Sequence, residues 1–313
     1  MRGGVGQVFS ESFEQQDATH RSEFRIGGVS VGVSGQHWDD VTLVPSLEPF
    51  RVETPASDIN IQVEWAEKLR SPSGPQLFDS GSVWRLYEDG TEFQFDFSAS
   101  LLGEQPYKRL FVDRCFRRAT LQMSEECFAG TDYLAAPLEY PLDELLIMHR
   151  LTQEKAIELH SCGIVRPDGT GNLFVGHSGA GKSTTTRLWT GREAVEVLSD
   201  DRIIVRRDVA DIAGCMRMYG TPWHGEAAYA SPASAPLARI FILEHGHGNV
   251  LTPLSPSQAV AELFARSFVP FHRHEYVDSA LQFLQELVDA VPCYRYAFEP
   301  NEAAVERILE FRD

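Results

Sequence analysis

The stretch of sequence that decides the fold of the second half of this chain is Gly176-His177-Ser178-Gly179-Ala180-Gly181-Lys182-Ser183. It follows the pattern G-x-x-x-x-G-K-S of a phosphate-binding loop, or P-loop. The residues before it, 173–175, are apolar, and those after it, 184–189, favour a helix. Glycines let the backbone curl so that successive N–H groups point at one phosphate, and the helix presents the positive end of its dipole to the same anion. The sequence therefore predicts a nucleoside triphosphate site between a strand and a helix.

The residues of this loop have separate expected roles. Lys182 reaches the β- and γ-phosphates, and the hydroxyl of Ser183 binds Mg²⁺. ATP and Mg²⁺ are the expected ligands, although the motif does not distinguish ATP from GTP or ADP. It also leaves open whether the triphosphate is used by a kinase, hydrolysed to drive motion or only sensed. The residues expected to contact the nucleotide are Gly176, His177, Ser178, Gly179, Ala180, Gly181, Lys182, Ser183 and Thr184.

Two adjacent carboxylates, Asp200 and Asp201, follow an apolar stretch, 194–198, downstream of the P-loop. The sheets of α/β proteins display functional groups at the carboxyl ends of their strands. Neighbouring residues leave a strand end in different directions, so one carboxylate can orient Mg²⁺ while the other accepts a proton from an attacking hydroxyl or water. The structural alternative is a solvated turn, because Asp-Asp-Arg is ordinary turn composition.

Three further residues are candidates for catalysis. His160 lies on a predicted strand, 157–165, where it could tune the proton acceptor or contact a phosphate, or serve only as a hydrogen-bonded structural residue. His224 and Glu226 belong to the segment 219–226, whose glycines, proline, aromatic ring, imidazole and carboxylate are typical of an active-site loop, although a shaped structural turn is the alternative. The basic residues that could neighbour a phosphate are Arg239, Arg266, His272, Arg273 and His274, although for most of them the alternative is a solvated place on the surface.

The composition limits the classes of function. The chain has 313 residues, 43% of them hydrophobic, and a net charge of −17, which argues against a nonspecific nucleic-acid or anionic-membrane surface. Its five cysteines are odd in number and lack C-x-x-C spacing, which argues against a disulfide framework or a zinc site. Residues 1–10 lack a hydrophobic leader, and no run of about 18 apolar residues occurs, so a cytoplasmic location is expected.

Two domains are expected, with boundaries at 1–135 and 136–313. The first contains short stretches rich in β-branched and aromatic residues, separated by turn signals, which predict a mostly antiparallel β domain. The pattern changes at Pro141, after which apolar residues recur at helical spacing. The expected strands of the first domain are 29–33, 59–65, 82–87, 92–97, 107–112 and 118–123.

The second domain alternates between strand-like and helix-like segments, which predicts an α/β organisation around the P-loop. Its expected strands are 157–165, 173–175, 194–198, 203–206, 239–243 and 291–298, and its expected helices are 183–190, 257–267, 279–290 and 302–311.

Several motifs of this second domain together resemble the kinase domain of HPr kinase/phosphorylase, a bacterial serine kinase with a phosphoenolpyruvate-carboxykinase-like core. They are His160, the turn at 169–171, the P-loop and the run Leu198-Ser199-Asp200-Asp201-Arg202. The resemblance covers about residues 140–313. It implies an α+β or α/β protein in which a mostly antiparallel β domain precedes an HPr-kinase-like P-loop domain. It also implies that Asp200 acts as base and that Asp201 and Ser183 hold Mg²⁺, with the reverse assignment of the two aspartates left open. The related kinases assemble into oligomers, which implies a homo-oligomer, although no pattern in this sequence specifies a subunit interface.

The chain departs from this family in two places. Thr184 stands where the family usually has an acidic residue, and the family's glycine-rich signature loop is not visible, since 219–226 occupies that region. HPr as substrate and the reverse phosphorylase reaction are therefore not carried over. The chain is more similar to the HPr-kinase-like proteins found beside peptide-modification genes, which implies an acceptor hydroxyl on a peptide or on a small molecule such as free serine.

The expected function is that of an Mg²⁺-dependent kinase that transfers the γ-phosphate of ATP to a hydroxyl of a peptide, a protein or a small molecule. The N-terminal domain would hold the acceptor or a partner, and no nucleic acid or membrane is expected to take part. Two other functions stay open at this point. One is a nucleotide-gated binding module without catalysis. The other is a carboxykinase on the same core, for which His224 and Arg239 alone do not supply the metal and carboxylate ligands.

Overall fold

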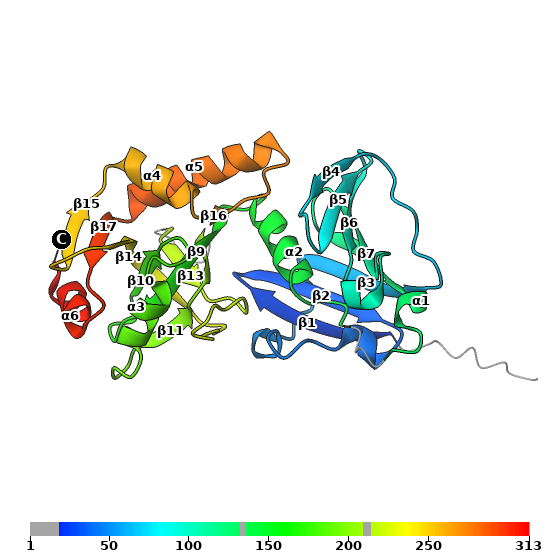
Figure 1. Cartoon of the computed structure of the whole chain (residues 1–313), viewed down its shortest axis with the longest axis horizontal. Coiled ribbons are helices and arrows are strands. Elements are labelled where there is room, and N and C mark those ends of the chain that lie inside the picture. Colours follow the sequence, from blue (N-terminus) through cyan, green and yellow to red (C-terminus); the bar gives the residue numbers. More distant parts are fainter. Residues whose placement is uncertain (1–18, 132–135, 209–213, 313) are drawn as a thin grey trace, which may run out of the picture.

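The computed structural model describes residues 19–131, 136–208 and 214–312. These residues form a mixed α/β protein with one sheet in each half of the chain (Figure 1). The helix α2 (Leu142–Leu151) lies between the two sheets. It begins where the apolar helical pattern predicts, with Pro141 at its N-cap.

The first sheet has eight strands in the order β1-β2-β3-β8-β7-β6-β5-β4. Strands β2, β3 and β8 run parallel to one another, and the other neighbours are antiparallel, so the expected mostly antiparallel β domain is confirmed. All six predicted strands are present, whereas β1 and β4 were not predicted. The strands are β1 (His20–Ile26), β2 (Val29–Gly35), β3 (Ile59–Ala66), β4 (Gln76–Asp79), β5 (Trp84–Glu88), β6 (Glu92–Phe97), β7 (Lys108–Asp113) and β8 (Arg118–Ser124).

Strand β3 illustrates why these segments form a sheet with one covered face. Ile59, Ile61 and Val63 are buried, while the alternating Asn60 and Glu64 are exposed. Because side chains of a strand point to opposite faces in turn, this alternation places the three apolar side chains on the same side of the sheet. That side packs into a core with apolar residues of β1, β2, β6 and β8.

The second sheet has nine strands, and five of them close into a barrel. Strands β10, β9, β12, β13 and β14 pair in this order, and β14 pairs back with β10. Strands β17 and β15 extend the sheet from β14, and β11 and β16 pair with β9. The strands are β9 (Ala156–Val165), β10 (Gly171–Val175), β11 (Glu196–Ser199), β12 (Arg202–Arg207), β13 (Met216–Tyr219), β14 (Ser234–His245), β15 (Val250–Pro253), β16 (Ser267–Phe268) and β17 (Cys293–Phe298).

This barrel corrects one expectation about the second half. Alternating strands and helices predict a P-loop core in which the sheet is mostly parallel. In the part of the chain that the structure describes, no core of this kind is evident. There, only the pairings β10–β14 and β14–β17 are parallel in this sheet. The reason lies in the connections: the turn 166–170 is too short for a crossover helix, so β10 folds back antiparallel to β9.

The helices of the second half follow the predicted segments closely. In α4, the residue Ser255 accepts from the Gln258 N–H in a capping box, and Pro256 is the first helical residue. Helix α5 begins five residues before the expected 279. In the described residues no helix is both long and apolar enough to cross a membrane. The helices of this half are α3 (Lys182–Trp189), α4 (Pro256–Phe264), α5 (His274–Ala290) and α6 (Glu302–Glu310). The first half contains the short α-helix α1 (Glu125–Phe128) and the 3-10 helices η1 (Trp38–Val41), η2 (Glu48–Phe50) and η3 (Ser100–Leu102).

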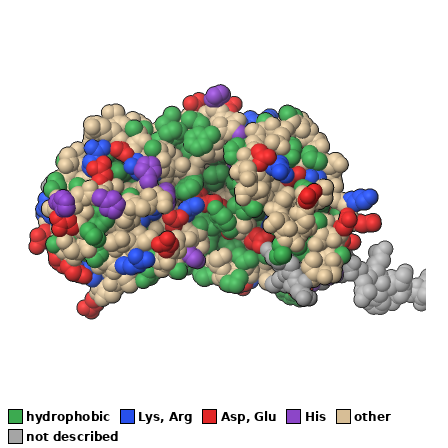
Figure 2. All heavy atoms as spheres, viewed as in Figure 1, with side chains coloured by type: hydrophobic (Ala, Val, Ile, Leu, Met, Phe, Trp, Pro, Cys, Tyr) green, Lys and Arg blue, Asp and Glu red, His purple; other side chains and the backbone are tan. Residues whose placement is uncertain are grey.

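One apolar cluster contains residues of both halves of the chain. The cluster built from the first sheet and α2 also contains Ile204 of β12 and Trp223. A polar contact lies beside it, where Arg206 Nη1 donates to Gly27 O at 2.7 Å. Figure 2 shows apolar side chains in the hollow between the two lobes. The predicted domain boundary falls at 135, outside the described residues, and stays a prediction.

Candidate functional site

The P-loop lies between the end of β10 and the start of α3, which is the strand-then-helix context that its motif requires. Gly181 precedes the helix with φ +104, a conformation that side chains other than glycine rarely adopt. A Cβ at Gly181 would lie 2.5 Å from Cζ of Phe298, at the end of β17. His245, at the end of β14, has its Nε2 2.8 Å from Gly179 O. The ends of β14 and β17 therefore support the loop from behind.

The ammonium group of Lys182 lies inside the curl of the loop. Its Nζ donates to Gly176 O at 3.1 Å and to His177 O at 3.2 Å, and it lies 4.0 Å from Asp201 Oδ1. The residue is only 6% exposed, and burial lowers its pKa, an effect that the charge of Asp201 opposes. The cation is thus held by two loop carbonyls beside the carboxylate of Asp201.

A cavity of about 390 Å³ opens beside this lysine. Its volume lies within the usual range of ligand sites. It joins the P-loop to residues that are distant in the sequence, and three of the expected nucleotide contacts, Gly176, His177 and Ala180, are not part of its wall. The wall consists of His160, Ser178, Gly179, Gly181, Lys182, Ser183, Thr184, Arg187, Asp201, Gly225 and Glu226.

Asp201 faces this cavity in an environment that keeps its carboxylate charged. His160 Nε2 lies 2.9 Å from Asp201 Oδ1, and Arg202 Nη1 donates to the other oxygen. Burial alone would raise the pKa of Asp201, but the hydrogen bond from His160 and the charges of Arg202 and Lys182 hold it below its usual value. The predicted neighbours His160 and Asp201 are therefore brought together beside Lys182.

Asp200, by contrast, is not part of the cavity wall. It is only 1% exposed. Its carboxylate accepts three backbone hydrogen bonds, from the N–H groups of Gly225 at 3.0 Å, Ala227 at 2.8 Å and Tyr229 at 3.2 Å. Asp200 thus fastens the segment 225–229 to the bend that follows β11.

Residues of the predicted loop 219–226 also differ in their places: some lie outside the cavity and one lines it. Trp223 is buried, and its Nε1 donates to Asp143 Oδ2 at 2.9 Å, which ties the loop to α2. His224 is exposed and is not part of the cavity wall. Glu226 does line the cavity, and no hydrogen bond or ion pair joins its carboxylate to the described residues. Glu226 is thus the less constrained of the two carboxylates in the wall.

Arg202, which was not singled out from the sequence, connects Asp201 to the helix α2. Its Nε lies 2.5 Å from Glu144 Oε1 and 3.4 Å from Glu158 Oε1, and its guanidinium carbon lies 4.2 Å from the centre of the Phe268 ring. Burial raises the pKa of Glu158 well above its usual value, and the charge of Glu144 adds to this shift. Burial would lower the pKa of Arg202, but the neighbouring carboxylates raise it overall, so the guanidinium stays charged.

The arginine in the cavity wall is not among the phosphate neighbours proposed from the sequence. Arg266 and Arg273 form ion pairs with glutamates and do not line the cavity. Arg187 lines it instead, four residues after Ser183 on α3. That spacing, which puts two side chains on one helix face, is the signal in the sequence that could have found it.

The cavity wall suits Mg²⁺, which needs only one or two protein ligands, better than it suits a metal ion whose ligands are all protein side chains. In the described ranges, no group of three or more His, Cys, Asp and Glu side chains could hold a metal ion. Magnesium, however, usually takes one or two protein oxygens and completes its shell with water and substrate phosphates. Ser183 and Asp201 both line the cavity and supply oxygens of that kind.

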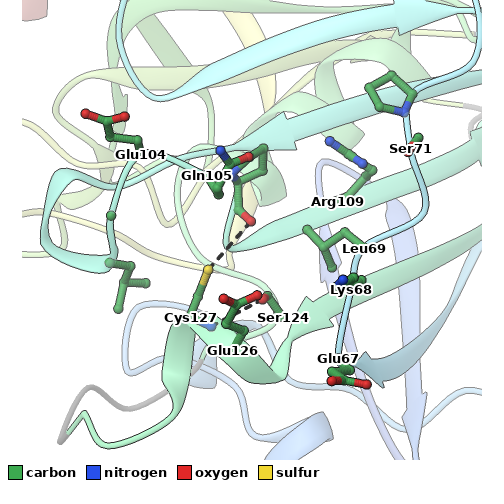
Figure 3. Close-up of a pocket in the computed structure, with 14 residues that line it drawn as sticks. Glu67, Lys68, Leu69, Ser71, Glu104, Gln105, Arg109, Ser124, Glu126 and Cys127 are labelled. Atoms are coloured by element: carbon green, nitrogen blue, oxygen red, sulfur yellow. Dashed lines mark hydrogen bonds between the residues drawn. The ribbon is translucent and has the colours of Figure 1, made fainter.

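A second cavity, of about 580 Å³, lies in the N-terminal half (Figure 3). Arg109 and Ser71 line one side of it, and Glu126 and Cys127 line the other. The guanidinium of Arg109 is already paired, because its Nε and Nη2 each lie 2.6 Å from an oxygen of Asp96. This cation is neutralised within the protein, so it contributes little to binding an anion.

No protein-family model matches this chain, and a search of curated proteins finds no match either. Its function is therefore inferred from the geometry of the cavity and from the resemblance carried by its motifs. Both motifs, 176–183 and 198–202, contribute side chains to the same cavity.

Proposed function

We propose that this protein is an Mg²⁺-dependent kinase that transfers the γ-phosphate of ATP to a hydroxyl group. The observation that carries this proposal is that one cavity joins Lys182 and Ser183 of the P-loop to two carboxylates, Asp201 and Glu226. Catalysis of phosphoryl transfer consists mostly of positioning and of stabilising charge. A lysine for the phosphates, a hydroxyl and a carboxylate for the metal, and a carboxylate for the acceptor proton are the groups that such a reaction needs.

The two carboxylates are assigned by their surroundings. His160 and Arg202 fix the orientation of Asp201, and this suits the residue that holds the metal together with Ser183. Glu226 has no described partner and is free to accept the proton of the acceptor hydroxyl. Bound Mg²⁺ would neutralise charge on the β- and γ-phosphates. Asp200, the base that the family resemblance implies, takes the role of holding the segment that carries Glu226.

The class of acceptor follows from the resemblance to HPr-kinase-like proteins. We assign the P-loop half of the chain to that group and expect the serine of a peptide or protein, or a small alcohol, as acceptor. The N-terminal half, which packs against the P-loop half through a shared core, would hold the acceptor. A cytoplasmic location, where ATP and Mg²⁺ are present, and a homo-oligomeric assembly belong to the same proposal.

The proposal is tested with the full chain, γ-labelled ATP, Mg²⁺ and a panel of acceptors: free serine, serine-containing peptides, HPr and a lysate of the source organism. We expect label to move to one class of acceptor and Lys182→Ala to remove both ATP binding and transfer. Glu226→Gln should lower kcat by about 10²- to 10⁴-fold, because a positioned base contributes that much, while the Kd for ATP stays within about twofold.

Asp201→Asn should instead raise the Mg²⁺ concentration needed for transfer.

Other outcomes separate the alternatives. If Glu226→Gln keeps full activity while a stably folded Asp200→Asn loses it, the base is Asp200. Tight ATP binding without transfer to any acceptor would indicate a nucleotide-gated binding module. Decarboxylation that depends on oxaloacetate would indicate a carboxykinase.

A further inference from the structure

Arg187 is a cation in the cavity wall whose charge no described residue balances. It lies on α3, one turn after the P-loop, and its side chain is exposed to the cavity. No hydrogen bond or ion pair joins it to the residues that the structure describes. The neighbouring Arg192, by contrast, is paired with Glu302 and Glu306.

The helix directs Arg187 towards the phosphate-binding end. Side chains of a helix tilt towards its N-terminus, so a residue covers the turn that precedes it. For Arg187 that turn contains Ser183 and Thr184, at i−4 and i−3, and all three line the same cavity. Neither is a carboxylate, so Arg187 has no partner one turn earlier on its own helix. A cation near the end of a helix also favours the helix dipole, but that role alone would not bring its side chain to the cavity.

The charge balance of the cavity points the same way. Lys182 is already bonded to loop carbonyls and lies 4.0 Å from Asp201. Asp201 and Glu226 add negative charge to a wall that has to accept a polyanion. An arginine suits such a site, because its planar fork binds two oxygens of a phosphate and remains charged at any physiological pH.

We propose that Arg187 binds the triphosphate chain of the nucleotide, on the side held by Ser183 and Thr184. This inference rests on the proposed nucleotide site and adds to it a ligand outside the P-loop motif. Arg187 then contributes to the affinity for the phosphates and does not contribute to the binding of the base or the sugar.

The test measures binding of inorganic tripolyphosphate and of ATP, each with Mg²⁺, to the full chain by calorimetry. Arg187→Ala should raise the Kd for both by about 10- to 100-fold, the range expected for a lost charge-assisted hydrogen bond, and Arg187→Lys should raise it less. Arg192→Ala is the matched control and should leave both Kd values unchanged. Unfolding without ligand should be the same for wild type and Arg187→Ala.

Each other result has a distinct meaning. If Arg187→Ala binds tripolyphosphate as wild type does while Lys182→Ala does not, the inference about Arg187 is wrong and the proposed site stands. If Arg187→Ala weakens ATP but not tripolyphosphate, Arg187 contacts the nucleoside and the phosphate assignment is wrong. If wild type binds neither probe, the proposed nucleotide site itself is wrong.

Discussion

Asp200 and Asp201 are neighbours in the sequence with opposite environments. Asp200 is 1% exposed and accepts three backbone N–H groups, whereas the side chain of Asp201 is 24% exposed and faces the cavity. Both residues lie in the bend between β11 and β12, where Asp200 bonds to the segment 225–229 and Asp201 bonds to His160 and Arg202. One residue type therefore serves in two ways, as an anchor for a loop and as a group in the cavity.

Asp200→Asn should destabilise the protein. The amide group of asparagine has one acceptor oxygen and one donor nitrogen, so at least one of the N–H groups of Gly225, Ala227 and Tyr229 loses its partner in a buried place. An unpaired buried group of this kind costs about 1–3 kcal/mol. Denaturant unfolding should show this loss of free energy of unfolding.

Asp201→Asn is the control, because its side chain is partly solvated, and we expect a smaller loss. Equal stability of Asp200→Asn and wild type, together with lost activity, would contradict the anchoring role.

The P-loop residues could be predicted from the sequence because their roles follow from a local pattern of glycines, lysine and serine. The division of labour between Asp200 and Asp201 could not. It depends on which backbone N–H groups of the segment 225–229 fold onto the strand end. The ion pairs of Arg202 likewise depend on contacts made in three dimensions, whereas Arg187 could have been found from its place four residues after Ser183 on one helix.

Among the elements, strands with alternating apolar residues were predicted well and strands without that pattern were not. All four residues of β4 are exposed, so its sequence has no apolar face to recognise. Strand β1 is rich in charged residues, and β13 has only four residues. The closure of β14 onto β10 was not predictable either, because these strands are about 60 residues apart and no local pattern encodes such a pairing.

Gly181→Ala tests how the ends of β14 and β17 shape the P-loop. Both Gly179 and Gly181 have positive φ, but only at Gly181 would a Cβ clash, 2.5 Å from Phe298 Cζ. We expect Gly181→Ala to lower the free energy of unfolding by more than the roughly 1 kcal/mol typical of a positive φ alone, and to weaken ATP binding. Thermal or denaturant unfolding measures the first effect and calorimetry the second.

Gly179→Ala is the matched control, because a Cβ there meets no atom within 4 Å. Equal effects of the two substitutions would mean that the contact with Phe298 does not constrain the loop.

At the scale of the whole molecule, two histidines lie where the halves meet. His149 of α2 stacks on Phe116 with ring centres 4.7 Å apart, and its ring lies 5.2 Å from that of His272. Burial lowers the pKa of His149 to about 3, with a further contribution from the charge of His272, and burial together with Arg273 lowers the pKa of His272 to about 4. Both histidines are therefore neutral in the folded protein at neutral pH.

Stability should consequently fall as the pH is lowered below about 6.5. In that range the unfolded chain binds protons that the folded chain does not, so the free energy of unfolding changes by about 1.4 kcal/mol per pH unit for each such histidine. His149→Gln should reduce this slope between pH 6.5 and 4.5, measured by denaturant unfolding at several pH values. Asp143, whose pKa burial raises to about 6, has the opposite effect, but it is present in both proteins.

His247→Gln is the control, because the side chain of His247 is 99% exposed. The same slope in wild type and His149→Gln would show that His149 takes up its proton without unfolding, contrary to this account.

The shared core also bears on how the protein is made. The first sheet ends with β8 at Ser124, but its apolar cluster includes Ile204 and Trp223, roughly 100 residues further on. Ribosomes add roughly 5–20 residues per second, so the nascent sheet waits for roughly 5–20 seconds with part of its apolar face uncovered. During that interval it is exposed to association with other chains. Translation speed and access to chaperones should therefore govern the yield of soluble protein.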